Sequence, residues 1–234
     1  MPVVARAPAL FMSWLDLAFL HWPVPHGALR GLVPRELEIE TFDGSAWVGV
    51  VPFEMRDVRL RFAPPLPGAH HFPELNVRTY VRLGDRQGVY FFSLDAASWP
   101  AVMGARVATG LRYFQARMAI HRDDARIRYH STRTHPGAAQ AVLACEYAAD
   151  GPVFASEPGS FEFWSTERYS LFSQRWGRLL RLDIEHPRWP LQRAVARIER
   201  NTIAVASGIS LPPTAPHVLF AAQQDVLAHW PRSV

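Results

Sequence analysis

Residues 72–81 have the sequence FPELNVRTYV, which carries the clearest signal for the fold of this chain. Its alternation of residue types at a period of two predicts a β-strand. One face of that strand is made of Leu75, Val77, Thr79 and Val81. The other face carries a carboxylate, an amide, a guanidinium and a phenol, on Glu74, Asn76, Arg78 and Tyr80. Such a mixed set is typical of a pocket wall, and the alternative is an ordinary solvated face with a Glu–Arg pair.

The composition favours one β-rich domain, although the length of 234 residues alone also fits two small ones. With 49% hydrophobic and 12% aromatic residues, the chain can bury a sizeable core. Its 20 prolines favour short strands and turns over long helices. Because we find no repeat, low-complexity tract or linker, we expect a single domain over residues 1–234.

The charge pattern gives little support for a nucleic acid partner. The net charge of +4 comes from 25 basic and 21 acidic residues, which are scattered without a run of five like charges. No apolar run approaches the roughly 18 residues of a membrane span. The N-terminus lacks a basic region followed by an apolar core of about 7–15 residues, so we expect no signal peptide. We therefore expect a soluble cytoplasmic protein without a membrane partner.

All 25 basic residues are arginine, and the chain contains no lysine. A GC-rich genome is the simplest explanation, but the consequence is chemical: no lysine is available to form a Schiff base. Cys145 is the only cysteine, which excludes intramolecular disulfides and zinc sites built from cysteine. We expect Cys145 to be a small buried side chain.

The hydrophobic pattern predicts many strands and few helices. Strands are expected at 11–22, 37–41, 72–81, 89–94, 111–121, 125–133, 140–147, 178–184 and 193–200, and helices at 26–33 and 99–108. Residues 47–61 fit a long strand or a bent pair, and residues 219–230 close the chain. Residues 161–173 fit either a helical turn or a strand. We expect a hairpin from 72–81 and 89–94, a meander from the next three strands, and an antiparallel pair from 178–184 and 193–200. The predicted fold class is mainly antiparallel β with a few short helices (α+β), curled or closed into a barrel.

Several kinds of site find no support in the sequence. The adjacent pair His70-His71 would point to opposite faces of a strand, and no HxH or HExxH spacing occurs, so we expect no metal site. A GxSxG elbow and glycine-rich phosphate loops are also absent, so we expect no nucleotide cofactor. What remains is a set of carboxylates, guanidiniums and phenols: Glu54, Glu74, Arg78, Arg106, Tyr113 and the run Glu167-Arg168-Tyr169. Arginines inside a barrel would grip a substrate carboxylate or enolate, and a desolvated glutamate beside them would move protons. The alternative is that these groups form internal ion pairs or exposed charges.

Several blocks resemble the uncharacterised YqjF-like bacterial family across nearly the whole chain. They are LHWPVP at 20–25, FDGSAWV at 42–48, FPELNVRTYV at 72–81, GVYFFSLDA at 88–96 and TERY at 166–169. More distantly, the chain resembles acetoacetate decarboxylase. The matches are a short helix like 25–34, a strand containing Phe53-Glu54, a glutamate where Glu74 falls and a helix-to-strand passage like 104–113, all in the same order. This resemblance implies a β-cone around a buried cavity of ligand size.

The chain departs from the decarboxylase at its nucleophile. The lysine that forms the Schiff base there falls close to Arg112-Tyr113 here, and arginine stays protonated and cannot replace it. Decarboxylation by that route is therefore excluded. By analogy with the decarboxylase, Glu54 and Glu74 keep a role in proton transfer or in pairing with Arg78.

We expect a site inside the cone for an anionic or carbonyl-bearing small molecule, with non-covalent acid–base chemistry and no cofactor. The expected catalytic residues are Glu74, Glu54 and Tyr113, and the expected binding residues are Arg78, Arg106, Asn76, Tyr80 and Arg168. One alternative is a ligand-binding or sensing module that has lost the chemistry, and another is a structural or interaction domain. Trp189 and Trp230 are candidates for a contact between copies in a homo-oligomer, although tryptophan is more often buried.

Overall fold

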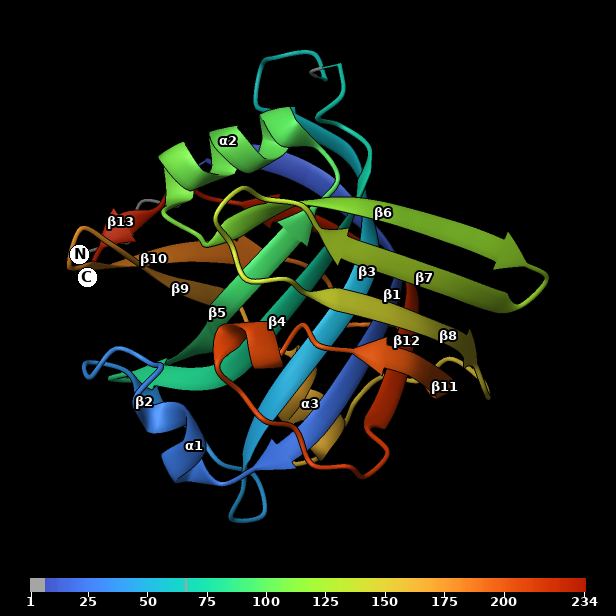
Figure 1. Cartoon of the computed structure of the whole chain (residues 1–234). Coiled ribbons are helices and arrows are strands. Elements are labelled where there is room, and N and C mark those ends of the chain that lie inside the picture. The colour runs from blue at the N-terminus through green and yellow to red at the C-terminus, as the bar shows by residue number, and fades with distance from the viewer. Residues whose placement is uncertain (1–6, 66) are drawn as a thin grey trace.

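The computed structural model describes residues 7–65 and 67–234. These residues form thirteen β-strands, three short α-helices and the connecting segments (Figure 1). The first elements are β1 (Leu10–Val24), α1 (His26–Arg30), β2 (Glu38–Ile39), β3 (Ala46–Leu60), β4 (Phe72–Leu83), β5 (Arg86–Ala96), α2 (Trp99–Thr109) and β6 (Tyr113–Asp123). The later ones are β7 (Arg126–Arg133), β8 (Val142–Ala149), α3 (Phe161–Thr166), β9 (Ser170–Arg175), β10 (Arg178–Glu185), β11 (Gln192–Asn201), β12 (His217–Ala228) and β13 (Arg232–Ser233). Every predicted strand and both predicted helices are present, and their ends differ by a few residues.

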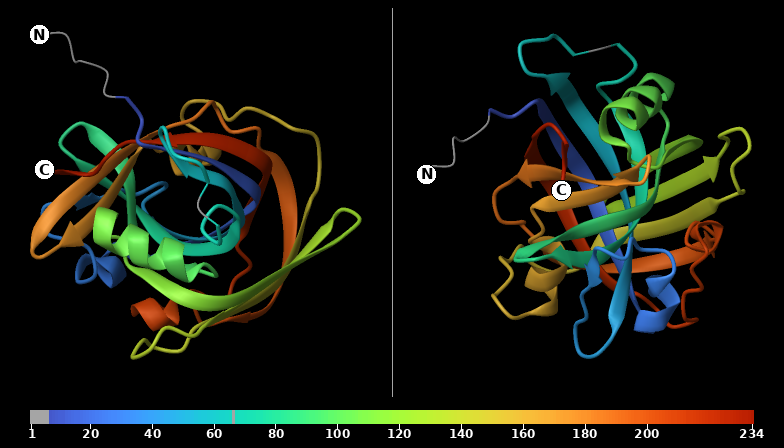
Figure 2. Two further views of the ribbon diagram at one scale, coloured as in Figure 1. Left: turned by 90° about the horizontal axis from the view of Figure 1, so that it is seen from above. Right: turned by 90° about the vertical axis from the view of Figure 1, so that its left-hand side faces the viewer.

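Nine of the strands close into a barrel, which Figure 2 shows from above. Their order is β5-β6-β7-β8-β11-β12-β1-β3-β4, and the pairing of β4 with β5 completes the ring. Among the strand pairings of residues 7–65 and 67–234, only those that β5 makes with β6 and β9 are parallel. The predicted fold class, mainly antiparallel β closed into a barrel with a few short helices, is therefore confirmed.

A second ring of strands uses part of the same sheet. β9 pairs with β5, β10 pairs with β9, and β10 also pairs with β12 at Ile184↔Ala228. These pairings close a ring of β9, β10, β12, β1, β3, β4 and β5. The strands β12, β1, β3, β4 and β5 therefore belong to both rings, and we call them the shared wall.

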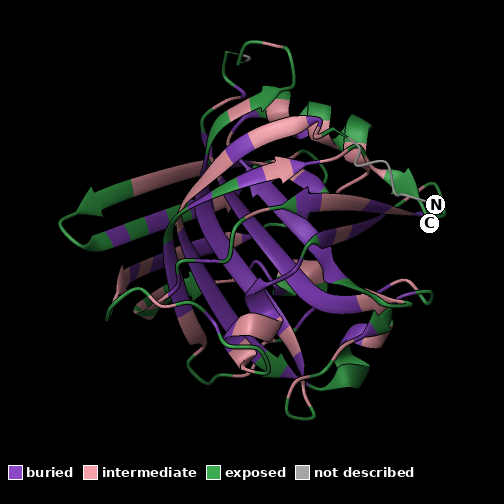
Figure 3. Ribbon diagram, turned by 180° about the vertical axis from the view of Figure 1, so that it is seen from behind, coloured by how far each residue is buried: buried purple, intermediate pink, exposed green. Residues whose placement is uncertain are grey.

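The nine-strand barrel is filled by apolar side chains that alternate along its strands. The strand β4 contributes Leu75, Val77 and Val81, and β7 and β8 contribute Tyr129 and Tyr147. Residues on the opposite face of the shared wall form a separate apolar cluster. Because both faces of the wall are covered, its strands are apolar on both sides, as VYFFSL at 89–94 indicates. Figure 3 shows this burial along the strands in the middle of the molecule.

Four expectations about strand arrangement have clear outcomes. The hairpin of β4 with β5 and the meander of β6, β7 and β8 are confirmed. The ambiguous segment 161–173 forms α3 and then begins β9. The predicted pairing of 178–184 with 193–200 is wrong, because β10 and β11 each pair with a different part of β12, which lies between them. Alternation along a strand reports which faces are buried and does not identify the neighbouring strand.

The helix α2 has a clear signal at each end. The Ser98 hydroxyl accepts a hydrogen bond from the Ala101 backbone N–H at 3.2 Å, which caps the first turn. Gly110 ends the helix in the left-handed conformation, with φ of 69°. A Cβ at Gly110 would lie 2.8 Å from the Arg175 Cβ, so glycine is required there.

Gly104→Ala is expected to stabilise the protein by about 0.5–1 kcal/mol, because glycine in a helix interior costs about that much relative to alanine. A Cβ at Gly104 would meet no atom of another described element within 4 Å. Urea denaturation followed by tryptophan fluorescence measures the change. Gly110→Ala is the control and is expected to destabilise. A loss of stability in Gly104→Ala would contradict the prediction.

Cys145 is buried, as predicted, and burial raises the pKa of its thiol to about 12, with a smaller contribution from the charge of Glu199. Within the described ranges, the helices are all too short or too polar to cross a membrane. The expectation of no signal peptide concerns in part residues 1–6, which lie outside the described residues.

Candidate functional site

A cavity of about 410 Å³ lies inside the second ring, on the face of the shared wall opposite the barrel core. Residues from β1, β3, β4, β5, β9, β10 and β12 line it, and α2 contributes Ala101, Gly104, Ala105 and Ala108 at one end. In Figure 1, α2 lies across the top of these strands. The volume falls in the range of about 300–1,000 Å³ that is usual for small-molecule sites.

The polar face of β4 forms part of the cavity wall. Glu74, Asn76 and Arg78 line the cavity and are all buried. Tyr80 follows on the same face, but it is buried beside the cavity, with its hydroxyl 2.5 Å from the His21 Nε2. Of the two interpretations of residues 72–81, the structure therefore matches the pocket wall.

Glu74 and Tyr113 meet at the cavity surface, although they come from β4 and the start of β6. The Tyr113 hydroxyl donates a hydrogen bond to the Glu74 Oε2 at 3.0 Å. Burial raises the pKa of Glu74 to about 8; the hydrogen bond from Tyr113 opposes this shift and the charge of Asp95 adds to it. Burial, and then the charge of Glu74, raises the pKa of Tyr113 well above its ordinary value. At neutral pH Glu74 is therefore mainly a neutral carboxylic acid that can give up a proton.

Arg78 differs from the other buried arginines of the described chain in having no carboxylate partner. The others are paired, as Arg133–Asp95, Arg168–Glu40 and Arg181–Asp183. Within the described part, the Arg78 Nη2 donates a hydrogen bond to the Ser165 carbonyl at a long 3.4 Å, and the guanidinium also interacts with the Tyr80 side chain. Its Nε has no partner there. A buried cation without a counterion is unfavourable, so this position favours an anion from outside the chain.

Two further groups beside Arg78 complete the polar end of the cavity. The Asn76 Oδ1 has no hydrogen-bond partner within the described residues. Arg168 also lines the cavity, but its guanidinium is held by Glu40 and by the Trp164 carbonyl, the latter at 2.5 Å from Nε. Burial lowers the pKa of Arg168, and Glu40 opposes this shift. Arg78 is therefore the guanidinium that is available to a ligand.

Glu54 and Arg106, which the sequence also suggested, do not line the cavity. Phe53 lies directly across from Glu74 in the β3–β4 register and shares its face, so Glu54 points to the other side of the sheet. There the Glu54 carboxylate accepts hydrogen bonds from His71 at 2.7 Å and from Arg122 at 2.5 Å. Burial opposes ionisation of Glu54, but these two partners lower its pKa.

Arg106 lies on the exposed face of α2 and donates from Nη1 to the Tyr113 carbonyl at 2.6 Å. It therefore ties the helix to the strand that carries Tyr113.

Two buried polar pairs near the cavity were not predicted. Asp95 accepts two hydrogen bonds from Arg133, at 2.6 and 2.9 Å, in a fully buried ion pair. His21, which bonds Tyr80, is also fully buried, and burial followed by the charge of Arg78 lowers its pKa well below the ordinary value. Both pairs join residues far apart in the sequence, so no spacing motif marks them.

Trp189 is buried and lines the cavity, whereas Trp230 is exposed on one side of its mouth. Trp189 is therefore part of the site and is not available for a contact between copies of the chain.

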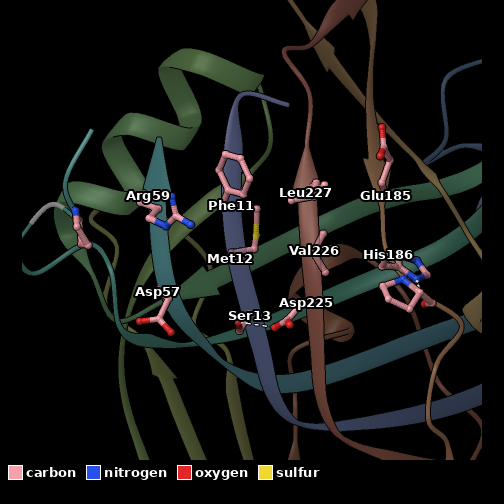
Figure 4. A pocket seen from close by; sticks show the side chains of 12 residues that line it. Phe11, Met12, Ser13, Asp57, Arg59, Glu185, His186, Asp225, Val226 and Leu227 are labelled. Carbon is pink, nitrogen blue, oxygen red and sulfur yellow. Dashed lines mark hydrogen bonds between the residues drawn. The ribbon is translucent and has the colours of Figure 1, made fainter. Parts of the chain in front are cut away.

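A second hollow, of about 750 Å³, is open to the surface near the ends of β1, β3 and β12 (Figure 4). Its carboxylates outnumber its single arginine, and one of them, Asp225, already accepts a hydrogen bond from Ser13 at 2.7 Å. It contains none of the residues predicted for the site, and we assign it no ligand.

The closed barrel with a lined cavity defines the class of fold, and solved structures share it. The acetoacetate decarboxylase of Legionella pneumophila matches 100% of this chain and 92% of its own, with a TM-score of 0.69 and 12% identity. The enduracididine biosynthesis enzyme MppR, in complex with pyruvate, matches 99% of this chain and 93% of its own, with a TM-score of 0.65 and 12% identity. An acetoacetate decarboxylase-like enzyme from Sphingomonas wittichii gives a TM-score of 0.64 at 13% identity, over 100% and 96% of the two chains. The chain therefore has the acetoacetate decarboxylase-like fold, as the sequence resemblance implied.

The family follows from sequence. Residues 11–225 match the model of the DUF2071 family, which is described as an uncharacterized conserved protein. The chain is also 42% identical, over 219 residues, to the uncharacterized protein YqjF of Bacillus subtilis (strain 168), covering 94% of this chain and 89% of that protein. This chain belongs to the DUF2071 family, and the predicted resemblance to YqjF is confirmed.

Proposed function

We propose that this protein binds an anionic, carbonyl-bearing small molecule in the cavity and acts on it by non-covalent acid–base chemistry. The observation that carries the proposal is Arg78, a buried guanidinium in the cavity wall without a carboxylate partner among the described residues. A ligand carboxylate would supply the missing charge and accept the fork of N–H donors. MppR is known in complex with pyruvate, an acid of this chemical kind, which supports the choice of ligand.

The neighbouring side chains have separate roles in this proposal. Asn76 lies two residues from Arg78 on the same face and would donate from its Nδ2 amide to the ligand's carbonyl or carboxylate oxygen. Glu74 would donate its proton toward an enolate-like oxygen, and Tyr113 would hold the Glu74 carboxyl in place. Tyr80 and Arg168 would support the wall behind these groups. Since the chain has no lysine, no step proceeds through a Schiff base.

A second candidate function is binding without catalysis, in a sensing or carrier role. The absence of lysine favours it, because the cavity lacks the nucleophile of the decarboxylase that the chain resembles. Mass spectrometry of the protein purified without added ligand separates the two functions. A retained, unconverted acid supports binding alone, whereas turnover in a panel of oxo and hydroxy acids supports an enzyme.

Calorimetric titration of wild-type protein with 2-oxo and 3-oxo acids is expected to show saturable binding. Arg78→Ala is expected to weaken it by at least about 30-fold, because loss of one member of a buried charged pair costs about 2–5 kcal/mol. Arg128→Ala is the matched control, since Arg128 is an exposed arginine of β7 outside the cavity, and the affinity of this variant should equal that of wild type. Unchanged binding in Arg78→Ala would contradict the proposed site.

A further inference from the structure

The polar groups assigned to the proposed function lie close together in the cavity wall; Arg59, Arg168, His186 and His229 line it elsewhere, and most of the remaining lining is apolar. Glu74, Asn76, Arg78 and Tyr113 come from β4 and the adjacent start of β6. The strands around them contribute large apolar side chains, among them Phe19, Val51, Phe53, Phe91, Leu94 and Trp189. A ligand of three or four carbons would engage the polar end and leave most of this apolar surface in contact with water, which is unfavourable.

The helix α2 leaves space at the end of the cavity farther from Arg78, because Glu74 pairs with Ala96, close to the start of α2, whereas Arg78 pairs with Phe91. Its small residues Ala101, Gly104, Ala105 and Ala108 recur at helical spacing and line the cavity. Its larger residues Met103 and Val107 are 41% and 63% exposed.

A helix that covers a filled core normally turns its larger apolar side chains inward. In α2 Val102 is buried in this way, but Trp99, Met103 and Val107 are exposed, so only small side chains line the cavity beneath the helix and it extends there, where Leu or Phe side chains would otherwise fill it. Several buried polar atoms of the cavity lining have no partner among the described residues, among them the Arg78 Nε, a donor that a ligand carboxylate could satisfy, and this is independent evidence that the same cavity receives a ligand.

We infer that the ligand is an amphipathic oxo acid, whose carboxylate binds Arg78 and whose apolar tail of several carbons extends toward α2. This inference rests on the function proposed above and specifies the class of ligand. The tail contacts the aromatic and aliphatic lining, and the small residues of α2 provide the room for its end.

The test is a calorimetric titration of the wild-type protein with unbranched 2-oxo acids, from pyruvate to 2-oxooctanoate. Burial of a methylene is worth about 0.8 kcal/mol, so affinity is expected to rise about fourfold with each added carbon until the cavity is full. A variant of α2 locates the tail. Ala105→Phe fills the space beneath the helix. It is expected to reduce the ratio of the affinities for 2-oxooctanoate and pyruvate at least tenfold.

Val107→Phe is the matched control, because it adds a phenyl ring to the exposed face of the same helix. It is expected to keep the wild-type dependence on chain length. Thermal denaturation establishes that both variants are folded before they are titrated.

The outcomes separate this inference from the proposed function. Arg78-dependent binding that does not strengthen with chain length would overturn the inference and leave the proposed function standing. Equal chain-length dependence in wild type and Ala105→Phe would also overturn it. Binding of none of the oxo acids, or tight binding of long acids that persists in Arg78→Ala, would overturn both.

Discussion

Glu74→Gln is expected to stabilise the protein above pH 8 by a few kcal/mol and to have little effect near pH 4. The folded protein holds the Glu74 proton with a pKa of about 8, whereas the unfolded chain releases it near the ordinary value of 4.5. A raised folded-state pKa gives a stability that is fully present below pH 4.5 and is lost as the pH rises toward 8. Glutamine has nearly the same shape and no charge to bury, so the variant avoids this loss. Each unit of pKa difference corresponds to about 1.4 kcal/mol.

Urea denaturation of both proteins at several pH values between 4 and 9 measures the effect. Glu54→Gln is a control with the opposite sign, because the pKa of Glu54 is lowered by His71 and Arg122. Its ionised form stabilises the folded state above the unfolded-state pKa, so Glu54→Gln is expected to destabilise at neutral pH. A difference between wild type and Glu74→Gln that does not change with pH would show that Glu74 titrates normally.

Asp95→Asn is expected to cost about 3–5 kcal/mol, because it leaves Arg133 charged and buried without its partner. Both side chains of this pair are almost completely removed from solvent. The loss is a large fraction of the total stability of about 5–15 kcal/mol that is usual for a folded domain. Urea denaturation at pH 7 measures it.

The matched control is Arg126→Ala, which breaks an ion pair of similar length with Glu146 at the surface. Exposed pairs are worth about 0–1 kcal/mol, so its effect should be small. The double variant Asp95→Leu with Arg133→Met removes both charges and is expected to recover much of the loss. Equal costs for Asp95→Asn and Arg126→Ala would contradict the assigned role of the buried pair.

The sequence predicted the fold well where the evidence was local. Strand positions and the two faces of residues 72–81 follow from a period of two, and the polar set of Glu74, Asn76 and Arg78 is contiguous on one strand. The sequence failed on relations between distant strands. The separation of 178–184 from 193–200 depends on the position of β12, which no local pattern contains.

The position of Glu54 was unpredictable for a related reason. The strand β3 is buried on both faces around Phe53, so its pattern carries no signal for which side faces the cavity. Only the register with β4 places Phe53 beside Glu74 and turns Glu54 away. The hydrogen bond of Tyr113 with Glu74 likewise joins two strands, β6 and β4, that are distant in the sequence. Only the order of blocks in the resemblance to the decarboxylase suggested that these two residues belong to one site.

Within the shared wall, the two faces of the strand β4 have different surroundings. Along β4, the side chains of Leu75 and Val77 pack in the barrel core. The alternating Glu74, Asn76 and Arg78 line the cavity on the opposite face. Under the proposed function, a substitution on one face of β4 would change the contacts with the ligand, whereas a substitution at the next position would change the packing of the barrel. The specificity of the cavity and the stability of the scaffold would then be altered separately along a single strand.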